Sequence, residues 1–145
     1  MRALIQRVEY AKVTVKDEIV GSIGPGLCVL VGVTHTDGVA ESRKIAKKIK
    51  KLRIFDDSEG VMNLSSLDTN SEVLVVSQFT LYGDTSRGNR PSWINAAKPE
   101  HAEPLIEEIV KTLREEGLNV ATGQFRAYMK VELVNDGPST VIIEA

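Results

Sequence analysis

The run from Leu27 to Val33 (LCVLVGV) places seven residues in succession without one charged or strongly polar side chain. A strand that is solvated on one face alternates apolar and polar residues. An unbroken apolar run of this length is therefore typical of a strand covered on both faces. This feature favours a layered fold, in which other elements pack on both sides of a sheet.

Other segments show the two-residue period of strands. Residues 3–15 alternate and predict a long strand, bent near Ala11. Lys16-Asp17-Glu18 is a polar turn that leads into a return strand from Glu18 to Ile23, so a hairpin is expected. Four further strands are predicted at residues 72–78, 120–122, 126–134 and 140–144, with the turn Asn135-Asp136-Gly137-Pro138 separating the last two.

Two segments change to the period of a helix, residues 38–53 and residues 99–116. Pro104 suits a first turn, so the second regular helix is expected to start around Glu103, and Gly117 is expected to end it. Residues 55–71 are polar and rich in turns. The predicted fold is an α/β fold with largely antiparallel β-sheet and two main helices.

The length of 145 residues predicts one domain, spanning 1–145. No apolar run approaches the ~20 residues of a membrane helix, and the N-terminal segment lacks the apolar centre of a signal peptide. We therefore expect a cytoplasmic protein with no membrane partner. Cys28 lies inside the apolar run and is expected to be a buried, inert thiol. Neither His35 nor His101 has metal-ligand neighbours, so we expect no metal and no cofactor.

The net charge of −2 argues against a general nucleic-acid binder, which is expected to be basic. Residues 43–53 are a local exception. Two interpretations of that segment stay open: a solvated helix face, or a face that binds RNA phosphates. Its seven cations are Arg43, Lys44, Lys47, Lys48, Lys50, Lys51 and Arg53.

Three features are candidates for a functional site. In Ser77-Gln78-Phe79-Thr80-Leu81 a buried strand ends in hydroxyl and amide groups and is followed by a long loop, an arrangement that often lines a site. The simple alternative is a strand end that satisfies its own backbone. Asn135 to Thr140 (NDGPST) is either a plain turn or a special element, and its Gly-Pro bond can take either isomer. Arg7 lies in an alternating strand; if buried, its planar fork needs several acceptors.

The chain resembles the D-aminoacyl-tRNA deacylase family from end to end. The similarity is carried by ALIQRVEYAKVTV, GLCVLVGV, RIFDDSEGVMNLS, SQFTLYGD, RGNRPSW and NDGPST. SQFTL and NxGPxT are the two signatures of the family, and their order within a full-length match makes the resemblance specific. Departures are small: Ser139 stands where valine is usual, and Trp93 where phenylalanine is common.

The resemblance implies a barrel-like fold with two sheets, helices on one side, and a homodimer with two equivalent sites near the dimer interface. It implies that the Gly137–Pro138 bond is cis and enters the site of the other subunit, with Arg7 helping to orient it. Met129 matches a pocket-lining position. The residues implied in catalysis are Gln78, Phe79 and Thr80; those implied in substrate binding and chiral selection are Gly137, Pro138, Ser77, Met129 and Arg7.

The implied partner is the aminoacylated 3′ end of tRNA, with no DNA. The implied reaction hydrolyses the ester of D-aminoacyl-tRNA and spares L-aminoacyl-tRNA. Glycyl-tRNA mischarged on alanine tRNA is an expected second substrate, because glycine has no side chain to clash. The N–H groups of Phe79 and Thr80 are candidate oxyanion donors. The resemblance favours a water activated with help from the ribose 2′-hydroxyl over a nucleophilic Thr80, which would need a base.

Two rival functions remain. An L-selective editing hydrolase, or one specialised for glycine, is expected to differ at Gly137 and Pro138, which this chain keeps. A non-catalytic tRNA-binding module would use the basic residues 43–53 and would have no need of SQFTL. Such a module is expected to bind tRNA with strong salt dependence and without cleaving the ester.

Overall fold

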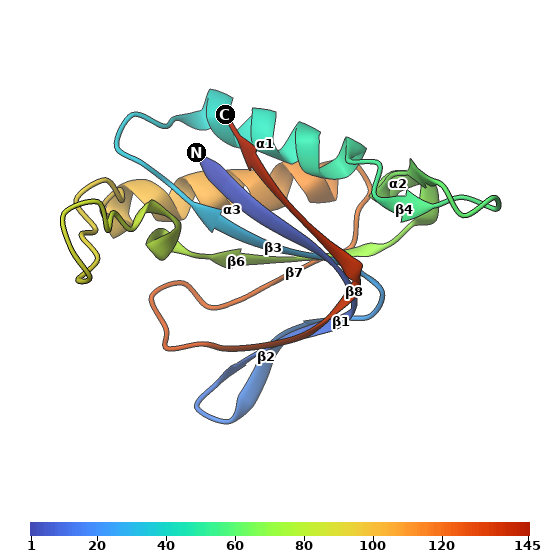
Figure 1. Cartoon of the computed structure of the whole chain (residues 1–145), viewed down its shortest axis with the longest axis horizontal. Coiled ribbons are helices and arrows are strands. Elements are labelled where there is room, and N and C mark those ends of the chain that lie inside the picture. Colours follow the sequence, from blue (N-terminus) through green and yellow to red (C-terminus); the bar gives the residue numbers. More distant parts are fainter.

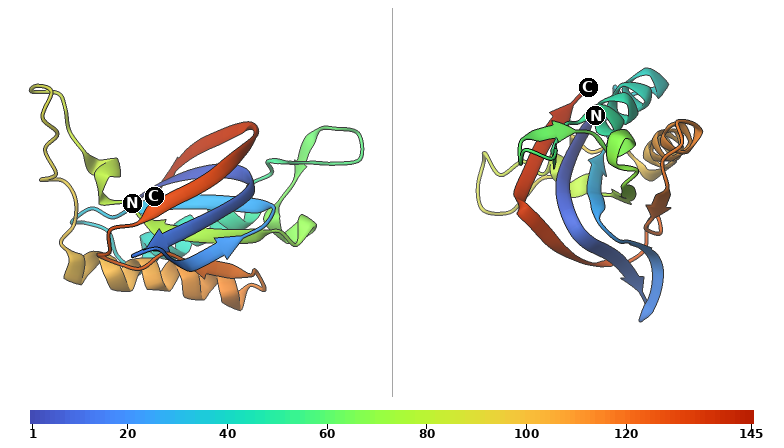
Figure 2. Two further views of the ribbon diagram at one scale, coloured as in Figure 1. Left: turned by 90° about the horizontal axis from the view of Figure 1, so that it is seen from below. Right: turned by 90° about the vertical axis from the view of Figure 1, so that its right-hand side faces the viewer.

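A curved six-stranded sheet dominates the computed structural model, which describes all residues from 1 to 145. Its path is β2-β1-β3-β6-β7, and β8 joins it by pairing with β1. Figure 2 shows how the long strands curve into a nearly closed, barrel-like sheet. The strands are β1 (Arg2–Val15), β2 (Glu18–Ile23), β3 (Gly26–Gly32), β6 (Glu72–Ser77), β7 (Val120–Thr122) and β8 (Lys130–Glu144).

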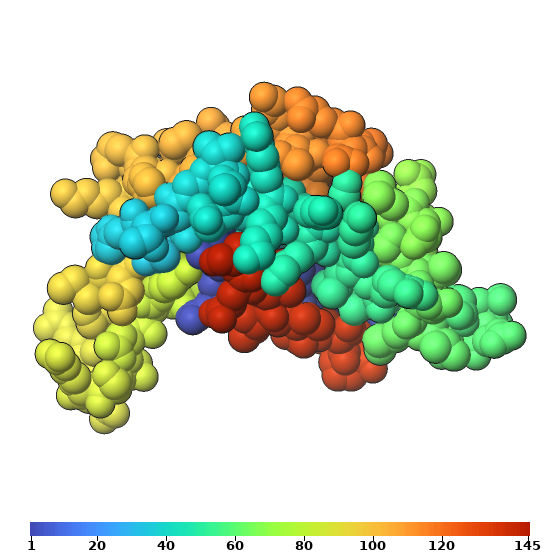
Figure 3. All heavy atoms as spheres, turned by 90° about the horizontal axis from the view of Figure 1, so that it is seen from above, coloured from blue at the N-terminus to red at the C-terminus, as the bar shows by residue number.

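Two long helices, α1 (Val39–Lys51) and α3 (Pro99–Glu115), lie side by side on one side of this sheet (Figures 1 and 3). The predicted fold class, with its two main helices on one side, is therefore confirmed. No helix has both the length and the apolar character needed to cross a membrane. The remaining elements are a small sheet of β4 (Phe55–Asp56) and β5 (Met62–Leu64), the short helix α2 (Ser66–Thr69) and the 3-10 helix η1 (Phe79–Tyr82).

Strand β1 organises the sheet because it has a different partner along each half. Residues Arg2–Val8 pair antiparallel with β3, and residues Ala11–Val15 pair antiparallel with β2. The partner changes between Val8 and Ala11, where the sequence predicts a bend. Strand β8 pairs with β1 along nearly its whole length. The other half of the sheet is parallel, since β6 pairs parallel with both β3 and β7.

Strand β3 is buried on both faces, as its apolar run predicts. Leu27, Val29 and Val31 belong to a cluster of 21 buried residues that joins the sheet to the helices. Cys28 points the other way, into a second cluster of 8 buried residues inside the curve of the sheet. Full burial of one such aliphatic side chain contributes about 1.5–3 kcal/mol, so the two clusters hold the sheet in place between them.

The Cys28 thiol is 1% exposed, and burial raises its pKa to about 11. At pH 8 only about one thousandth of it is thiolate, the reactive form. We expect a thiol reagent to label native Cys28 more than about 100-fold more slowly than the urea-unfolded chain, followed by mass spectrometry. Because the folded pKa lies above the unfolded one, the free energy of unfolding should fall as the pH rises from about 9 to 11. Fast labelling of the native protein would contradict both expectations.

Two parts of the chain differ from the sequence prediction. Helix α3 begins at Pro99 and not near Glu103, and Pro104 lies inside it. Proline has no N–H, so Pro104 cannot donate the helical hydrogen bond to the carbonyl of Glu100. Because Glu100 is exposed, water can donate to that carbonyl instead. Gly117, at φ +90°, follows the end of the helix as predicted. Residues 55–71, expected to be irregular, contain β4, β5 and α2.

The largest difference concerns the C-terminal strand. The sequence predicts two strands, 126–134 and 140–144, separated by a turn. The structure has one strand, β8, from Lys130 to Glu144. The Asn135-Asp136-Gly137-Pro138 segment does not reverse the chain, because pairing with β1 resumes on both sides of it.

Candidate functional site

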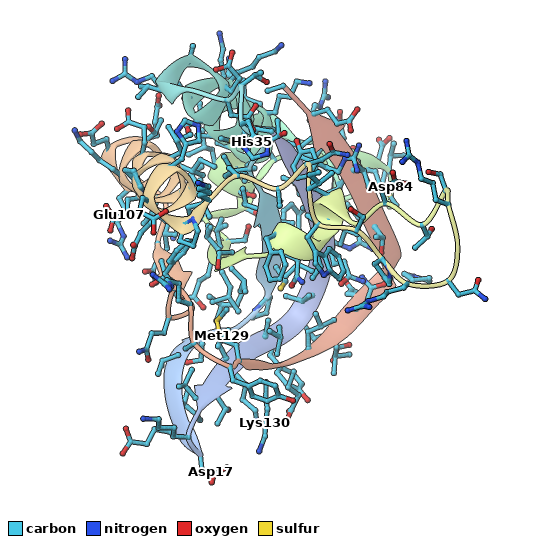
Figure 4. The ribbon with its side chains drawn as sticks, turned by 90° about the vertical axis from the view of Figure 1, so that its left-hand side faces the viewer. Asp17, His35, Asp84, Glu107, Met129 and Lys130 are labelled. Carbon is cyan, nitrogen blue, oxygen red and sulfur yellow. The ribbon has the colours of Figure 1, made fainter.

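A cavity of about 660 Å³ opens at the end of β6, a volume within the range of small-molecule sites. Four of the residues predicted for the site line it: Ser77, Gln78, Phe79 and Met129. The first three come from the end of β6 and the start of η1, whereas Met129 comes from the segment before β8. Figure 4 faces this end of the molecule and labels Met129.

The sharp turn after β6 positions the SQFT residues. Ser77 is the last residue of β6 and pairs with Val31 of β3, and the Gln78 N–H donates to the Val31 carbonyl at 2.7 Å. The chain then enters η1 at Phe79. The first N–H groups of a helix have no acceptor within it, so those of Phe79 and Thr80 are available to a ligand.

Thr80 stands beside the cavity but does not line it. Its side chain is exposed, and its hydroxyl accepts a hydrogen bond from the side-chain amide of Gln78. An amide is not a base. The ring nitrogens of His35 and His101 contact the carbonyls of Ile94 and Asp37, at 2.8 Å each, and neither imidazole reaches Thr80.

The cavity wall is aromatic in a chain that has few aromatic residues. Phe79 and Trp93 pack edge to face, with ring centroids 5.5 Å apart. Gly83 permits this packing, since a Cβ there would lie 2.5 Å from the Trp93 ring. Four of the seven aromatic residues of the chain line the cavity: Phe79, Trp93, Phe125 and Tyr128. The sequence analysis did not include Trp93, Phe125 and Tyr128 among the site residues. The low aromatic content of the chain was a usable signal, because few aromatic residues remain for other places.

A second cluster of predicted residues surrounds Arg7. In the β1–β8 ladder Gln6 pairs with Thr140 and Val8 pairs with Asn135. Arg7 alone therefore faces the four residues 136–139, which form a bulge. The Asn135 side chain closes this bulge by donating to the carbonyls of Arg7, at 2.9 Å, and Ser139, at 3.0 Å.

Arg7 is buried, with 7% of its surface exposed, and its guanidinium fills the space under the bulge. It donates to the Ile54 carbonyl at 2.6 Å and lies 3.1 Å from the Asp136 carboxylate and 3.5 Å from that of Asp56. A buried guanidinium needs several acceptors, and these supply them. Gly137 has φ +112°, and a Cβ there would lie 2.5 Å from Nη2 of Arg7.

The cis isomer implied for the Gly137–Pro138 bond is wrong for this structure, which has no cis peptide bond. The segment lies within β8, where the backbone has to span from Asn135 to Thr140 to rejoin the ladder. A trans peptide advances the chain farther than a cis one and is favoured by about 0.5–1 kcal/mol before proline.

The structure therefore divides the eight predicted residues into two places. Ser77, Gln78, Phe79 and Met129 line the cavity, and Thr80 adjoins it through Gln78. Gly137 and Pro138 lie in the bulge with Arg7 opposite them, and none of the three lines the cavity of the same chain.

Four of the seven cations in residues 43–53, which span the end of α1, have partners within the chain. Arg43 pairs with Glu108 at 2.7 Å, and Lys50 pairs with Glu116 at 2.5 Å. Lys48 donates to the Glu144 carbonyl and Arg53 to the Asn63 carbonyl, at 2.8 Å each. The three that make no ion pair or side-chain hydrogen bond are Lys44, Lys47 and Lys51.

Comparison with known proteins matches residues 4–144 to the family model for D-Tyr-tRNA(Tyr) deacylase. A D-aminoacyl-tRNA deacylase of Heliobacterium modesticaldum is 58% identical over 144 residues, covering 99% of this chain and 96% of that protein. One from Geobacillus sp. (strain WCH70) is 55% identical over 145 residues, covering 100% and 95%. A solved structure described as a c-Myc DNA unwinding element binding protein superimposes with a TM-score of 0.94 at 39% identity, covering 100% of this chain and 99% of that one.

The family model spans nearly the whole chain, and both relatives align with it from end to end at more than half identity. The two motifs SQFTL and NDGPST fall within the matched range, the first at the cavity and the second at the bulge. The chain therefore belongs to the D-Tyr-tRNA(Tyr) deacylase family.

Proposed function

We propose that the protein hydrolyses the ester bond of D-aminoacyl-tRNA and releases the free D-amino acid and tRNA, as a cytoplasmic proofreading enzyme. The observation that carries this proposal is the turn from β6 into η1. It presents two N–H groups without helical acceptors, from Phe79 and Thr80, beside an aromatic cavity. Family membership supplies the class of substrate.

The aromatic wall suits the terminal adenosine of tRNA. A purine base stacks on aromatic side chains with about 1–3 kcal/mol per base. Phe125 and Tyr128 offer such surfaces in the cavity that the SQFT turn also lines, and Tyr128 is 88% exposed. Stacking there would set the ester carbonyl near the N–H groups of Phe79 and Thr80.

Hydrolysis then needs a water and stabilisation of an oxyanion. Water attacks the carbonyl carbon, the negative oxygen is held by the two N–H groups, and the ribose oxygen leaves with a proton. The ribose 2′-hydroxyl of the substrate assists the water in this proposal. The protein mainly positions the ester, since Thr80 is paired with an amide and not with a base.

A second copy of the chain would complete the site. The Gly137–Pro138 bulge does not line the cavity of its own chain, and apolar side chains stand exposed beside the cavity and along β8. In a homodimer that covers this surface, the bulge of one subunit would enter the cavity of the other. The exposed apolar residues include Phe79, Trp93, Ile94, Tyr128, Val131, Val134 and Ile142.

Such an arrangement would explain chiral selection. The two enantiomers carry the same groups, so the site has to reject the L form and not merely attract the D form. A rigid backbone wall at Gly137 and Pro138 would occupy the place of an L side chain. Glycyl-tRNA has no side chain to reject and would be a second substrate.

The proposal is tested by incubating the protein with matched D-tyrosyl-tRNA and L-tyrosyl-tRNA and following release of amino acid. We expect rapid loss of the D ester while the L ester persists, with glycyl-tRNA also cleaved. Cleavage of both enantiomers would support the hydrolase activity and contradict the proposed rejection of the L form by Gly137 and Pro138. Salt-dependent tRNA binding without cleavage would favour the non-catalytic module instead.

Replacement of Thr80 by alanine provides a test of the mechanism. We expect Thr80→Ala to keep substantial activity, with kcat reduced by less than about tenfold, because the N–H of residue 80 is retained and only a hydrogen bond to Gln78 is lost. The measurement is single-turnover hydrolysis of D-tyrosyl-tRNA. A loss of several orders of magnitude, or a trapped acyl-enzyme in the wild type, would establish Thr80 as the nucleophile.

A further inference from the structure

The surfaces on opposite sides of the cavity differ in charge. On one side, α3 presents Glu103 and Glu107 to a groove that adjoins the cavity. On the other side, the loop from Gly83 to Asn95 carries Arg87 and Arg90. Figure 4 shows this opposition, with Glu107 and the Asp84 loop on opposite sides of the view. A polyanion that approaches the cavity is repelled on the α3 side and attracted on the loop side.

The α3 side has cations as well, but they have partners. The Arg114 guanidinium donates to the Val120 carbonyl at 2.8 Å, and Lys111 lies 3.9 Å from the Glu115 carboxylate. The loop has one acid, Asp84, which lies at its base and accepts a hydrogen bond from the Ser86 N–H at 2.9 Å. Residues 85–91 (TSRGNRP) contain no acid at all.

The base of the loop is fixed against the cavity wall. Asp84 and Ser92 exchange two backbone hydrogen bonds, at 2.9 and 2.8 Å. The next residue, Trp93, packs against Phe79 in the wall itself. The rest of the loop projects from the body of the molecule (Figure 3, yellow-green, lower left). Arg87 and Arg90 therefore lie on a projecting loop whose base forms part of the cavity wall.

Arg87 and Arg90 are both exposed, and neither makes an ion pair or a side-chain hydrogen bond. A guanidinium with all its donors free matches a phosphate group in a bidentate geometry. Arg126, which also makes no ion pair or side-chain hydrogen bond, lines the cavity itself. No comparable set of free guanidinium groups occurs on α1, where Arg43 is paired with Glu108.

We propose that Arg87 and Arg90 bind backbone phosphates of the tRNA acceptor arm, next to the nucleotide whose ester enters the cavity. The inference rests on the proposed function and deepens it by placing the body of the RNA on the loop side. It also assigns the basic face of α1 to solvent. The loop, rather than the most basic stretch of the sequence, is the RNA-binding surface.

The test measures binding of uncharged tRNA as a function of salt. Each phosphate contact contributes about 0.7–0.9 to the slope of log affinity against log salt concentration. The double variant R87A/R90A is expected to reduce the slope by about 1.4–1.8 and to weaken binding at low salt. The matched double variant K44A/K47A removes two exposed, unpaired cations of α1 and is expected to keep the wild-type slope. An unchanged slope in R87A/R90A, or a reduced one in K44A/K47A, overturns the inference.

A second comparison separates loss of RNA contacts from damage to the cavity. D-tyrosyl-adenosine carries the ester but no phosphate, so kcat/KM of R87A/R90A should fall far less on this ester than on D-tyrosyl-tRNA. Equal losses on both would place the arginines in the support of the cavity and reject their role with phosphate. Failure of the wild type to cleave either ester would reject the proposed function, whereas the binding slopes test the arginines independently.

Discussion

Replacement of Gly137 by alanine is expected to lower kcat/KM for D-tyrosyl-tRNA by about 100-fold and to lower the preference for the D ester. The added Cβ would lie 2.5 Å from Nη2 of Arg7, so either the bulge or the guanidinium has to move. Displacement of about 1 Å in a positioning group can cost about 100-fold in rate. Steady-state kinetics with the two enantiomeric esters provide the measurement.

The matched control is Gly117→Ala, because Gly117 also has positive φ, +90°, and its added Cβ would meet nothing within 4 Å. Both substitutions carry the backbone cost of about 1–2 kcal/mol for a left-handed residue with a side chain. We expect both to lower the free energy of unfolding, and only Gly137→Ala to affect the kinetics. Equal activity in the two variants would mean that the bulge has no part in the reaction.

Replacement of Arg7 is expected to have the second large effect, and on stability as well as on selectivity. Arg7→Ala removes the buried hydrogen bond of 2.6 Å that the Arg7 guanidinium donates to the Ile54 carbonyl, and leaves this carbonyl without a donor. The carboxylates of Asp56 and Asp136 are about half exposed, so water replaces most of what they lose. We expect the free energy of unfolding in urea to fall by about 2 kcal/mol. Arg7→Lys should recover only part of this, because an ammonium cannot span all these acceptors.

Lys12→Ala is a suitable comparison on the same strand. Lys12 pairs with Glu132 at 3.1 Å but is 35% exposed, so its loss should cost less than about 1 kcal/mol. Kinetics distinguish the two roles of Arg7. If Arg7→Lys folds and still prefers the D ester as strongly as the wild type, then Arg7 supports the fold only and does not orient Gly137 and Pro138.

Regular periodicity made much of the fold predictable. Residues 18–23 are a strand with the predicted ends, and the long alternating strand and the strand at 72–77 differ from prediction by about one residue. The turn between β1 and β2 consists of Lys16 and Asp17, both with positive φ, the geometry that matches the twist of a two-residue hairpin. In each case the local pattern and the tertiary environment favour the same structure.

The prediction was wrong where local and tertiary signals disagree. Asn135 and Gly137 are turn-forming residues, yet the long ladder with β1 keeps the chain in one direction across them. Short elements such as β4 and β5 have too few residues to show a period. A sequence pattern could not assign Phe125 and Tyr128 to the same cavity as Phe79, because their approach depends on the curvature of the whole sheet.

The bulge opposite Arg7 separates the residues of β8 that pair with β1 from the residues 136–139 that the strand presents outside the ladder. The ladder on either side of residues 136–139 fixes the sheet, and Asn135 bridges the gap with its own side chain. Residues within the gap contribute little to strand pairing. Insertions, deletions or substitutions there can accordingly change what the segment presents while the register of β1 with β8 persists. A fold built in this way can evolve a new selectivity at 136–139 without having to rebuild its scaffold.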